Sequence, residues 1–295
     1  MIHICEVGPR DGLQNEAQLL TTEVKVEMIG RLIEAGCQKI EAVSFVNPKV
    51  VPQMADAEEV LRYAPQYSDV VYAGLVLSRS GLERASRTNI DMLHIVMAVS
   101  DAFNQRNARR SAAESAAELS AVIREASAAG KPCIGVLGTA FGCPFEGEVS
   151  IENVLAIADQ FLEAGCEGIT LADTTGMAHP LQVQAWVRAF TKRFPDVELG
   201  LHFHNTRGLG LANVFAGYQA GVRIFDSSLA GLGGCPFAPK AVGNVCTEDM
   251  VNMFREMGEE TGMEVEKLIE TACWMEEKIG RRLDGMLMKT GTVKM

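Results

Sequence analysis

The chain has 295 residues, 47% of them hydrophobic and 22% charged, which is the composition of a globular protein with a large core. Its formal net charge of −11 argues against nucleic acid as a partner, because a phosphate-binding surface needs a basic stripe and the sequence has none. No apolar run approaches the roughly 20 residues of a spanning helix, and the N-terminal stretch lacks the pattern of a secretory signal, so no membrane partner is expected.

Short apolar segments alternate with segments of helical periodicity along the whole chain. In chain order, strands are predicted at 2–7, 38–44, 70–76, 92–98, 131–138, 167–172, 197–203 and 222–228. Helices are predicted between them, at 22–35, 52–63, 80–88, 111–129, 151–164, 180–193 and 208–220, and an eighth begins near Thr247.

A helix–turn–strand unit recurs in four places. Its copies are EAGCQKIEAVSF from Glu34, AAGKPCIGVLGT from Ala128, EAGCEGITLADT from Glu163 and QAGVRIFDSSLA from Gln219. In each copy a glycine ends the helical segment, as expected of a left-handed C-terminal cap, and an apolar strand follows. Eight buried strands alternating with helices favour a closed (β/α)8 barrel of the α/β class, with a doubly wound open sheet as the alternative.

We interpret residues 1–262 as the barrel and 263–295 as a C-terminal helix and tail packed on the same domain, because no Pro/Ser-rich linker divides the chain. The stretch 254–280 could also mediate a contact between subunits, so a homo-oligomer stays open. Eight scattered cysteines without a C-x-x-C pair favour reduced thiols and a cytoplasmic location, although an organellar matrix is an alternative.

Polar residues gather where the predicted strands end, which is where a (β/α)8 barrel carries its chemistry. They are Arg10, Asp11, Glu41, Ser44, Asp173, His202, His204, Ser227 and Ser228. A carboxylate at such a position is costly unless it is paired or bound to a metal.

His202 and His204 lie two residues apart in HFHNTRG, so their side chains project from the same side of the strand. Two adjacent imidazoles at a barrel mouth favour a divalent-cation site over two histidines that only hydrogen-bond to neighbours. Asp11 could add an oxygen ligand, because the first strand adjoins the eighth in a closed barrel. Such a mixed nitrogen and oxygen set suits Mg²⁺ or Mn²⁺ better than Zn²⁺.

Arg10 follows a Gly8-Pro9 turn in EVGPRDGLQNE, which would direct Arg10 and Asp11 into the barrel mouth. A weak surface ion pair is the alternative. A guanidinium beside a metal suits the stabilisation of a developing enolate or carboxylate oxygen.

The segment GLGGCPFAPKAVGNVCTED, residues 231–249, is rich in glycine and carries Cys235. We interpret it as a lid that delivers an acid/base group, with an inert buried cysteine as the alternative. A phosphate-binding loop is disfavoured because no Gly-Lys-Ser/Thr follows. The amide oxygen of Asn244 could be a fourth metal ligand, and Glu248 could orient the ligands.

Five motifs occur in order between about residues 2 and 255: EVGPRDGLQNE, IEAVSFVNPKVVPQM, ITLADTTG, HFHNTRG and GLGGCPFAPKAVGN. Together they resemble the 3-hydroxy-3-methylglutaryl-CoA (HMG-CoA) lyase family, part of a wider group of metal-dependent lyases and Claisen-type synthases built on a TIM barrel. The resemblance implies that the metal ligands are Asp11, His202, His204 and Asn244.

The same resemblance implies that Arg10 stabilises the enolate oxygen of the acyl-CoA fragment and that Cys235 takes part in proton transfer. Glu41 and Asp173 match polar residues that support the site. The implied reaction cleaves the C2–C3 bond of a 3-hydroxy-acyl-CoA, HMG-CoA giving acetyl-CoA and acetoacetate. Further candidates for contacting the acyl-CoA are Gln14, Ser44, Lys49 and Asn107.

The chain departs from the family pattern beside the predicted metal ligands. Asn205 and Arg207 stand where Asp and Tyr are common, and Val242 where a small polar residue is common. Arg207 could bind an additional carboxylate or pair with an acidic helix. Citramalyl-CoA and longer 3-hydroxy-3-alkylglutaryl-CoA thioesters are therefore alternative substrates.

Two other functions are alternatives. A condensing synthase of the isopropylmalate or homocitrate type usually carries a long C-terminal extension, whereas this chain ends about 45 residues after the last barrel motif. A catalytically silent barrel acting as a binding module is disfavoured because every proposed ligand is present.

Overall fold

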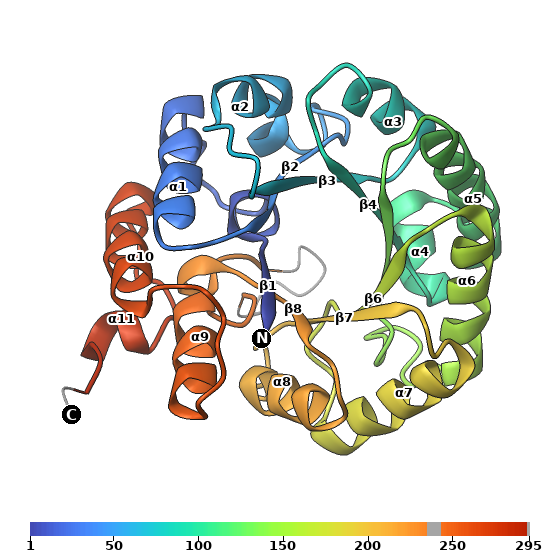
Figure 1. The fold of residues 1–295 in the computed structure, drawn as a ribbon. Helices are drawn as coiled ribbons and strands as arrows, with labels where there is room; N and C mark the ends of the chain where they lie inside the picture. The colour runs from blue at the N-terminus through green and yellow to red at the C-terminus, as the bar shows by residue number, and fades with distance from the viewer. Residues whose placement is uncertain (235–242, 294–295) are drawn as a thin grey trace.

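Eight parallel strands close into a barrel in sequential order, and helices surround it (Figure 1). The structure is a computed structural model and describes residues 1–234 and 243–293. The strands are β1 (His3–Glu6), β2 (Lys39–Ser44), β3 (Val71–Val76), β4 (Met92–Ala98), β5 (Cys133–Gly138), β6 (Gly168–Asp173), β7 (Glu198–Phe203) and β8 (Ile224–Ser227). β8 pairs with β1 from His3↔Ile224 to Glu6↔Ser227, which closes the barrel. The predicted (β/α)8 TIM barrel is confirmed.

The helices follow the strands along the chain. They are α1 (Thr22–Glu34), α2 (Ala57–Tyr63), α3 (Arg79–Ala85), α4 (Asp101–Ala108), α5 (Ala112–Ala128), α6 (Ile151–Ala164), α7 (Pro180–Arg193), α8 (Gly210–Gln219), α9 (Thr247–Glu256), α10 (Val265–Ile279) and α11 (Leu287–Thr290). Three shorter turns are η1 (Gly8–Gly12), η2 (Pro52–Met54) and η3 (Leu229–Gly231).

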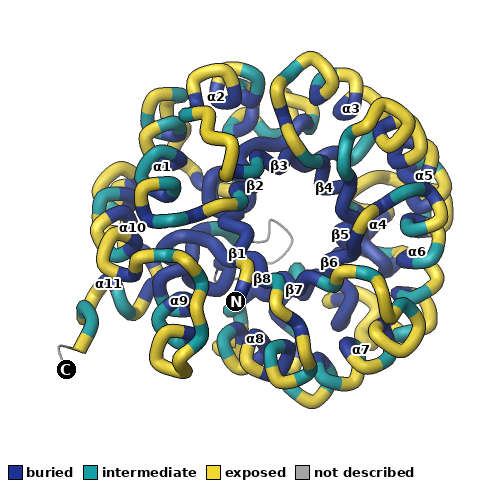
Figure 2. The backbone as a smooth tube through the Cα atoms, in the orientation of Figure 1, coloured by how far each residue is buried: buried dark blue, intermediate teal, exposed yellow. Residues whose placement is uncertain are grey.

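Burial of apolar side chains between the strands and the helices forms the core, and the outward sides of the helices are exposed (Figure 2). α5 illustrates the local rules. Ser111 and Glu114 form a capping box at its start, and Leu119, Val122 and Ile123 are buried on its inner face. Burial of each such side chain stabilises the fold by roughly 1.5–3 kcal/mol.

The helix α4 was not predicted. Its sequence, DAFNQRNA, is largely polar, and only Phe103 and Asn104 are buried, so it carries no apolar periodicity. Asn104 nevertheless fixes the helix, because its side-chain amide donates to the backbone carbonyls of Arg110 and Ser111 at 3.0 and 2.9 Å.

The C-terminal helix α10 packs beside α1 and α9 (Figure 1). The assignment of 263–295 to the same domain as 1–262, and the formation of a homo-oligomer, stay predictions. Within the described residues, no helix combines the length and the apolar character needed to cross a membrane.

Candidate metal centre and active site

A single π-helical turn, η1, follows β1 and places Arg10 and Asp11 at the carboxyl end of the barrel. The backbone amide of Asp11 donates to the carbonyl of Val7 at 2.7 Å. The Gly8 amide donates to Glu6 Oε1 at 2.7 Å, and a Cβ at Gly8 would lie 2.5 Å from that oxygen, so a side chain there would displace the carboxyl group. Arg10 and Asp11 are both buried, with 8% and 7% of their surface exposed.

The two imidazoles of HFHNTRG lie side by side. His202 is on β7 and His204 follows it directly, with ring centroids 5.2 Å apart. Phe203 between them packs against Phe141 instead, with centroids 5.6 Å apart. The alternation expected of a strand thus holds, and both histidines are buried.

Asp11, His202 and His204 converge on one point. Asp11 Oδ2 lies 4.0 Å from His202 Nε2 and 3.7 Å from His204 Nε2, and one potential ligand atom from each residue lies within 4.8 Å of the others. Among the described residues, these three form the group of histidine, cysteine and acidic side chains suited to hold a metal ion. Carboxylate and imidazole ligands together suit a divalent cation.

Asn244 joins this group from the far end of the chain. Its Nδ2 donates to Asp11 Oδ2 at 2.7 Å and to the Leu232 carbonyl at 3.0 Å. Its Oδ1 is buried and has no hydrogen-bond partner among the described residues. A buried orphan oxygen is costly, and a cation beside it would satisfy it, so the donor set fits a metal. A Cβ at the preceding Gly243 would clash with the Gly231 carbonyl, so glycine allows this approach.

Charges and burial set the protonation of the three groups. Burial alone would raise the pKa of Asp11, but Arg10 and the two imidazoles outweigh it and lower this pKa to about 2. Burial and the neighbouring His202 lower the pKa of His204 to about 4. Asp11 is therefore a carboxylate and His204 a neutral imidazole at pH 7, which are the forms that bind metals.

Asp226 orients His202, although it is not among the site residues predicted from the sequence. Its Oδ2 lies 3.2 Å from His202 Nδ1, which leaves Nε2 toward Asp11. This hydrogen bond and the charges of Asp226 and Asp11 overcome burial and raise the pKa of His202. A carboxylate behind a metal-binding histidine is the usual outer support of such sites. The signal was an aspartate inside the apolar strand RIFDSS.

A second buried group of hydrogen-bonded side chains consists of Arg10, Glu41 and His94. Arg10 Nε donates to Glu41 Oε2 at 2.5 Å, and Arg10 Nη1 donates to Asp11 Oδ1 at 2.6 Å. Glu41 Oε1 lies 2.9 Å from His94 Nδ1. Although burial would raise the pKa of Glu41, the charge of Arg10 and the hydrogen bond with His94 outweigh it and lower this pKa. Sequence analysis did not select His94, a polar residue within the apolar strand MLHIVMA.

A cavity of about 770 Å³ opens above these groups. Among the predicted site residues, it is lined by Arg10, Asp11, Gln14, Glu41, Asn107, His202 and His204. The apolar residues that line the cavity include Leu75, Val96, Val136 and Ala172. Arg106 and Arg109 also line it, so the cavity has cations on its α4 side despite the net negative charge of the chain.

Three predicted substrate-binding residues do not line this cavity. Ser44 is buried on β2, and Lys49 lies in an exposed loop. Arg207 was expected to bind a carboxylate or to pair with an acidic helix. Its guanidinium instead donates to the carbonyls of Thr175 and Gly176 at 2.8 and 2.9 Å, because the preceding turn brings it over the β6–α7 loop.

Two acidic residues that were predicted to support the site, Asp173 and Glu248, accept hydrogen bonds from backbone amides rather than from the metal group. Asp173 accepts hydrogen bonds from the amides of Met177 and Ala178 at 2.7 and 3.0 Å, which holds the loop after β6. Glu248 was expected to orient the ligands, but the hydrogen bond that its carboxyl group accepts comes from the Ala230 amide at 2.9 Å. The reason is that Glu248 lies in the first turn of α9, beside η3. Cys235 and Val242 lie outside the described residues.

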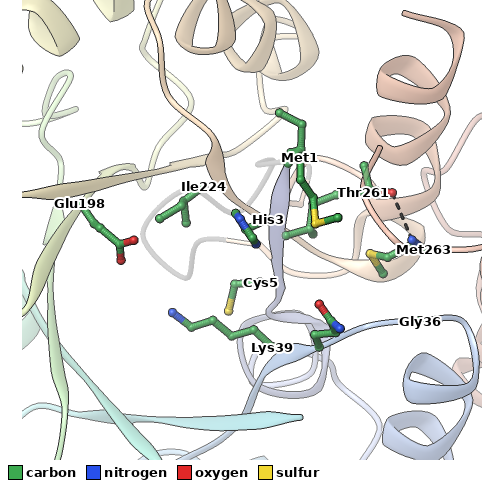
Figure 3. Close-up of a pocket in the computed structure, with 12 residues that line it drawn as sticks. Met1, His3, Cys5, Gly36, Lys39, Glu198, Ile224, Thr261 and Met263 are labelled. Atoms are coloured by element: carbon green, nitrogen blue, oxygen red, sulfur yellow. Dashed lines mark hydrogen bonds between the residues drawn. The ribbon is translucent and has the colours of Figure 1, made fainter. Parts of the chain in front are cut away.

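A smaller cavity, of about 220 Å³, lies at the amino ends of the strands (Figure 3). His3, Cys5, Lys39, Glu198 and Ile224 are among its lining residues. Since (β/α)8 barrels carry their chemistry at the carboxyl ends of the strands, the larger cavity is the candidate active site.

Comparisons with known proteins show which proteins this chain is similar to. A family model described as HMGL-like matches residues 1–274. The chain is 43% identical to the (R)-citramalyl-CoA lyase of Chloroflexus aurantiacus, covering 99% of this chain and 95% of that protein. It is 42% identical to a hydroxymethylglutaryl-CoA lyase of Bacillus subtilis, covering 96% of this chain and 94% of that protein.

Among solved structures, an HMG-CoA lyase of Acinetobacter baumannii in complex with coenzyme A and 3-methylmalate has a TM-score of 0.94 at 41% identity, covering 99% of this chain and 95% of that one. The relatives are named for the cleavage of carbon–carbon bonds in acyl-CoA thioesters. The chain therefore belongs to the HMGL-like family, the family that its motifs resemble.

Proposed function

We propose that this protein is a divalent-metal-dependent lyase that cleaves the C2–C3 bond of a 3-hydroxy-acyl-CoA, with HMG-CoA the first candidate substrate. The observation that carries the proposal is the convergence of Asp11, His202 and His204 beside the buried Arg10 at the mouth of the barrel. The family and its named relatives support the same reaction class.

The proposed metal ligands are Asp11, His202, His204 and Asn244, the last through its orphan Oδ1. Mg²⁺ and Mn²⁺ are the proposed ions, since the set contains no thiolate. A cation bound here would lower the pKa of the substrate hydroxyl and fix its geometry.

The cleavage itself balances without any further reagent. The C3 hydroxyl loses its proton, the C2–C3 bond breaks, and C3 becomes a ketone. The electron pair from that bond moves into the thioester as an enolate, and protonation of C2 then gives acetyl-CoA. With HMG-CoA the second product is acetoacetate.

Arg10 is the proposed stabiliser of the enolate oxygen. Glu41 and Asp11 hold its guanidinium from two sides before any substrate binds, and the guanidinium lines the cavity. A guanidinium has five N–H donors, so some are free to face the substrate. A donor preorganised in this way typically lowers such a barrier by about 3–4 kcal/mol.

Cys235 is proposed, from the sequence motif alone, to supply the proton to C2. Arg106, Asn107 and Arg109 are proposed to contact the coenzyme A part of the substrate, because they line the α4 side of the cavity and two of them are cationic. Gln14 is a further substrate contact; its Nε2 also donates to Asp11 Oδ1 at 3.3 Å.

Citramalyl-CoA is the second candidate substrate. The 43% identity to an (R)-citramalyl-CoA lyase and the replacement of the common Asp and Tyr by Asn205 and Arg207 favour it. Cleavage would then give acetyl-CoA and pyruvate by the same bond changes. The remaining proposals are longer 3-hydroxy-3-alkylglutaryl-CoA substrates and a condensing synthase activity.

A panel of 3-hydroxy-acyl-CoA thioesters, assayed for acetyl-CoA release, tests the proposal. We expect turnover of HMG-CoA or citramalyl-CoA, its loss in EDTA and its return with Mg²⁺ or Mn²⁺. Condensation of acetyl-CoA with a keto acid, without release, would identify a synthase. Binding without turnover in either state would identify a binding module.

The described cysteines are free, six of them buried and Cys273 exposed, which supports the proposed cytoplasmic location.

A further inference from the structure

His94 lies inside the candidate active site although neither the motifs nor the proposed mechanism uses it. It is on β4, only 4% exposed, and lines the 770 Å³ cavity together with Arg10 and Glu41. On the same strand, Val96 is an apolar lining residue. A polar ring among apolar neighbours in a barrel interior needs partners for both of its nitrogens.

One nitrogen has its partner. His94 Nδ1 lies 2.9 Å from Glu41 Oε1. Glu41 is held as a carboxylate by Arg10, and a carboxylate only accepts hydrogen bonds. The hydrogen of this hydrogen bond is therefore on Nδ1, and Nε2 is left for another partner.

The other nitrogen has none. Nε2 of His94 is buried and has no hydrogen-bond partner among the described residues. Leaving a buried polar atom unpaired destabilises a protein, so such an atom is a candidate for contact with a ligand. The ring cannot turn Nε2 toward Glu41 without giving up the Nδ1 hydrogen bond, so the unpartnered nitrogen is fixed in a residue that lines the candidate active-site cavity.

We propose that His94 Nε2 is a substrate-binding atom that forms a hydrogen bond with a hydroxyl group of the acyl chain. This inference rests on the proposed function and specifies it: the enzyme selects hydroxylated acyl-CoA thioesters through His94 as well as through the metal group. Glu41 then serves two purposes, because the same carboxylate orients both the guanidinium of Arg10 and the ring of His94.

Two substitutions separate this contact from a merely structural role. In the His94→Asn variant, the asparagine amide can still donate to Glu41, but no atom occupies the position of Nε2. In the His94→Gln variant, the glutamine brings an amide oxygen near the position of Nε2, but the hydrogen bond to Glu41 is lost. His179→Asn is the matched control, since exposed His179 caps α7 by accepting from the Gln182 amide at 3.3 Å, and Asn is a good N-cap.

The ligands are two CoA thioethers in which a methylene replaces the thioester carbonyl, so that no cleavage occurs. One carries the C3 hydroxyl and the other carries hydrogen there. Their dissociation constants are measured with the full-length, Mn²⁺-loaded protein, alongside kcat/KM for the thioester that the wild type cleaves and thermal unfolding of each variant.

We expect His94→Asn to reduce the preference for the hydroxylated ligand about tenfold, the size of one hydrogen bond, while the deoxy ligand binds within about twofold of wild type. His94→Gln should retain more of that preference, and His179→Asn all of it. An unchanged preference in His94→Asn overturns the inference, and so does an equal loss for both ligands, which would mean a carboxylate or coenzyme A contact. A wild type that cleaves no thioester overturns the proposed function as well.

Discussion

The side-chain amide of Asn244 donates to Asp11 Oδ2 at 2.7 Å, a contact between residues 233 positions apart. It fixes the carboxylate that the two imidazoles face, and it leaves Asn244 Oδ1 buried without a partner among the described residues. The proposed metal site is thus closed by a residue from the segment before α9.

Asn244→Ala should weaken divalent-metal binding by about 10- to 100-fold, because it removes both the orphan oxygen and the hydrogen bond that holds Asp11. Titration of the apoprotein with Mn²⁺ measures this directly. Asn153→Ala, in the exposed first turn of α6, is the control and should bind as wild type does. Wild-type affinity in Asn244→Ala would exclude this residue from the metal site.

Arg10→Met should reduce kcat by about 10²- to 10³-fold, since it removes a preorganised donor to the enolate. Metal affinity should change less, because the three clustered ligand side chains remain. Steady-state kinetics on the cleaved thioester, with circular dichroism to check folding, would measure the effect. Retained kcat in a folded variant would remove Arg10 from the mechanism.

Asp226→Asn should lower metal affinity, as mutations behind metal-binding histidines commonly do by 10- to 100-fold. The amide lacks the charge that strengthens the hydrogen bond from His202 Nδ1, and it can present a donor to that nitrogen, which is 3.2 Å from Asp226 Oδ2. A Mn²⁺ titration at pH 7 is the measurement. If affinity is unchanged, the orientation of His202 does not depend on this carboxylate.

Cys235→Ala should lower the rate of acetyl-CoA release strongly while leaving Mn²⁺ binding near the wild-type value. This expectation comes from the motif, since the residue is outside the described ranges. Loss of metal binding would instead mean that the thiol is a ligand. A matched Cys273→Ala variant, which changes an exposed cysteine on α10, should be active.

The stability of the fold should fall between about pH 5 and pH 8 through Glu248. Burial raises the pKa of this carboxyl from 4.5 to about 8, so the folded state keeps a proton that the unfolded chain has already lost. The stabilisation is complete below pH 4.5 and is lost as pH rises through 8, at about 1.4 kcal/mol for each pKa unit. Glu6, whose pKa burial raises to about 7, acts in the same direction.

Glu248→Gln isolates this contribution because glutamine is neutral at every pH. Urea unfolding in EDTA at pH 5 and pH 8 should show the wild type losing free energy of unfolding relative to the variant as pH rises. A constant difference between the two proteins at both pH values would contradict the buried, protonated state of Glu248.

Much of the fold followed from local patterns. Apolar strands and helical periodicity predicted all eight strands, because each strand must bury itself against a helix nearby in the chain. His202 and His204 could be paired because a strand repeats every two residues. Asp11 could be joined to them because β1 closes the barrel against β8. α4 was missed because its contacts are polar.

By itself, then, the sequence determined the barrel and a candidate metal group, through rules that act over a few residues or through barrel closure. The tertiary structure alone decided the partners of buried polar groups. His94 contacts Glu41, 53 positions away, and Asp226 contacts His202, 24 positions away. Arg207 and Glu248 likewise reach backbone groups that were not predicted as their partners. The physical reason is that the register and closure of eight strands set which interior side chains face each other, and that depends on the whole packed barrel.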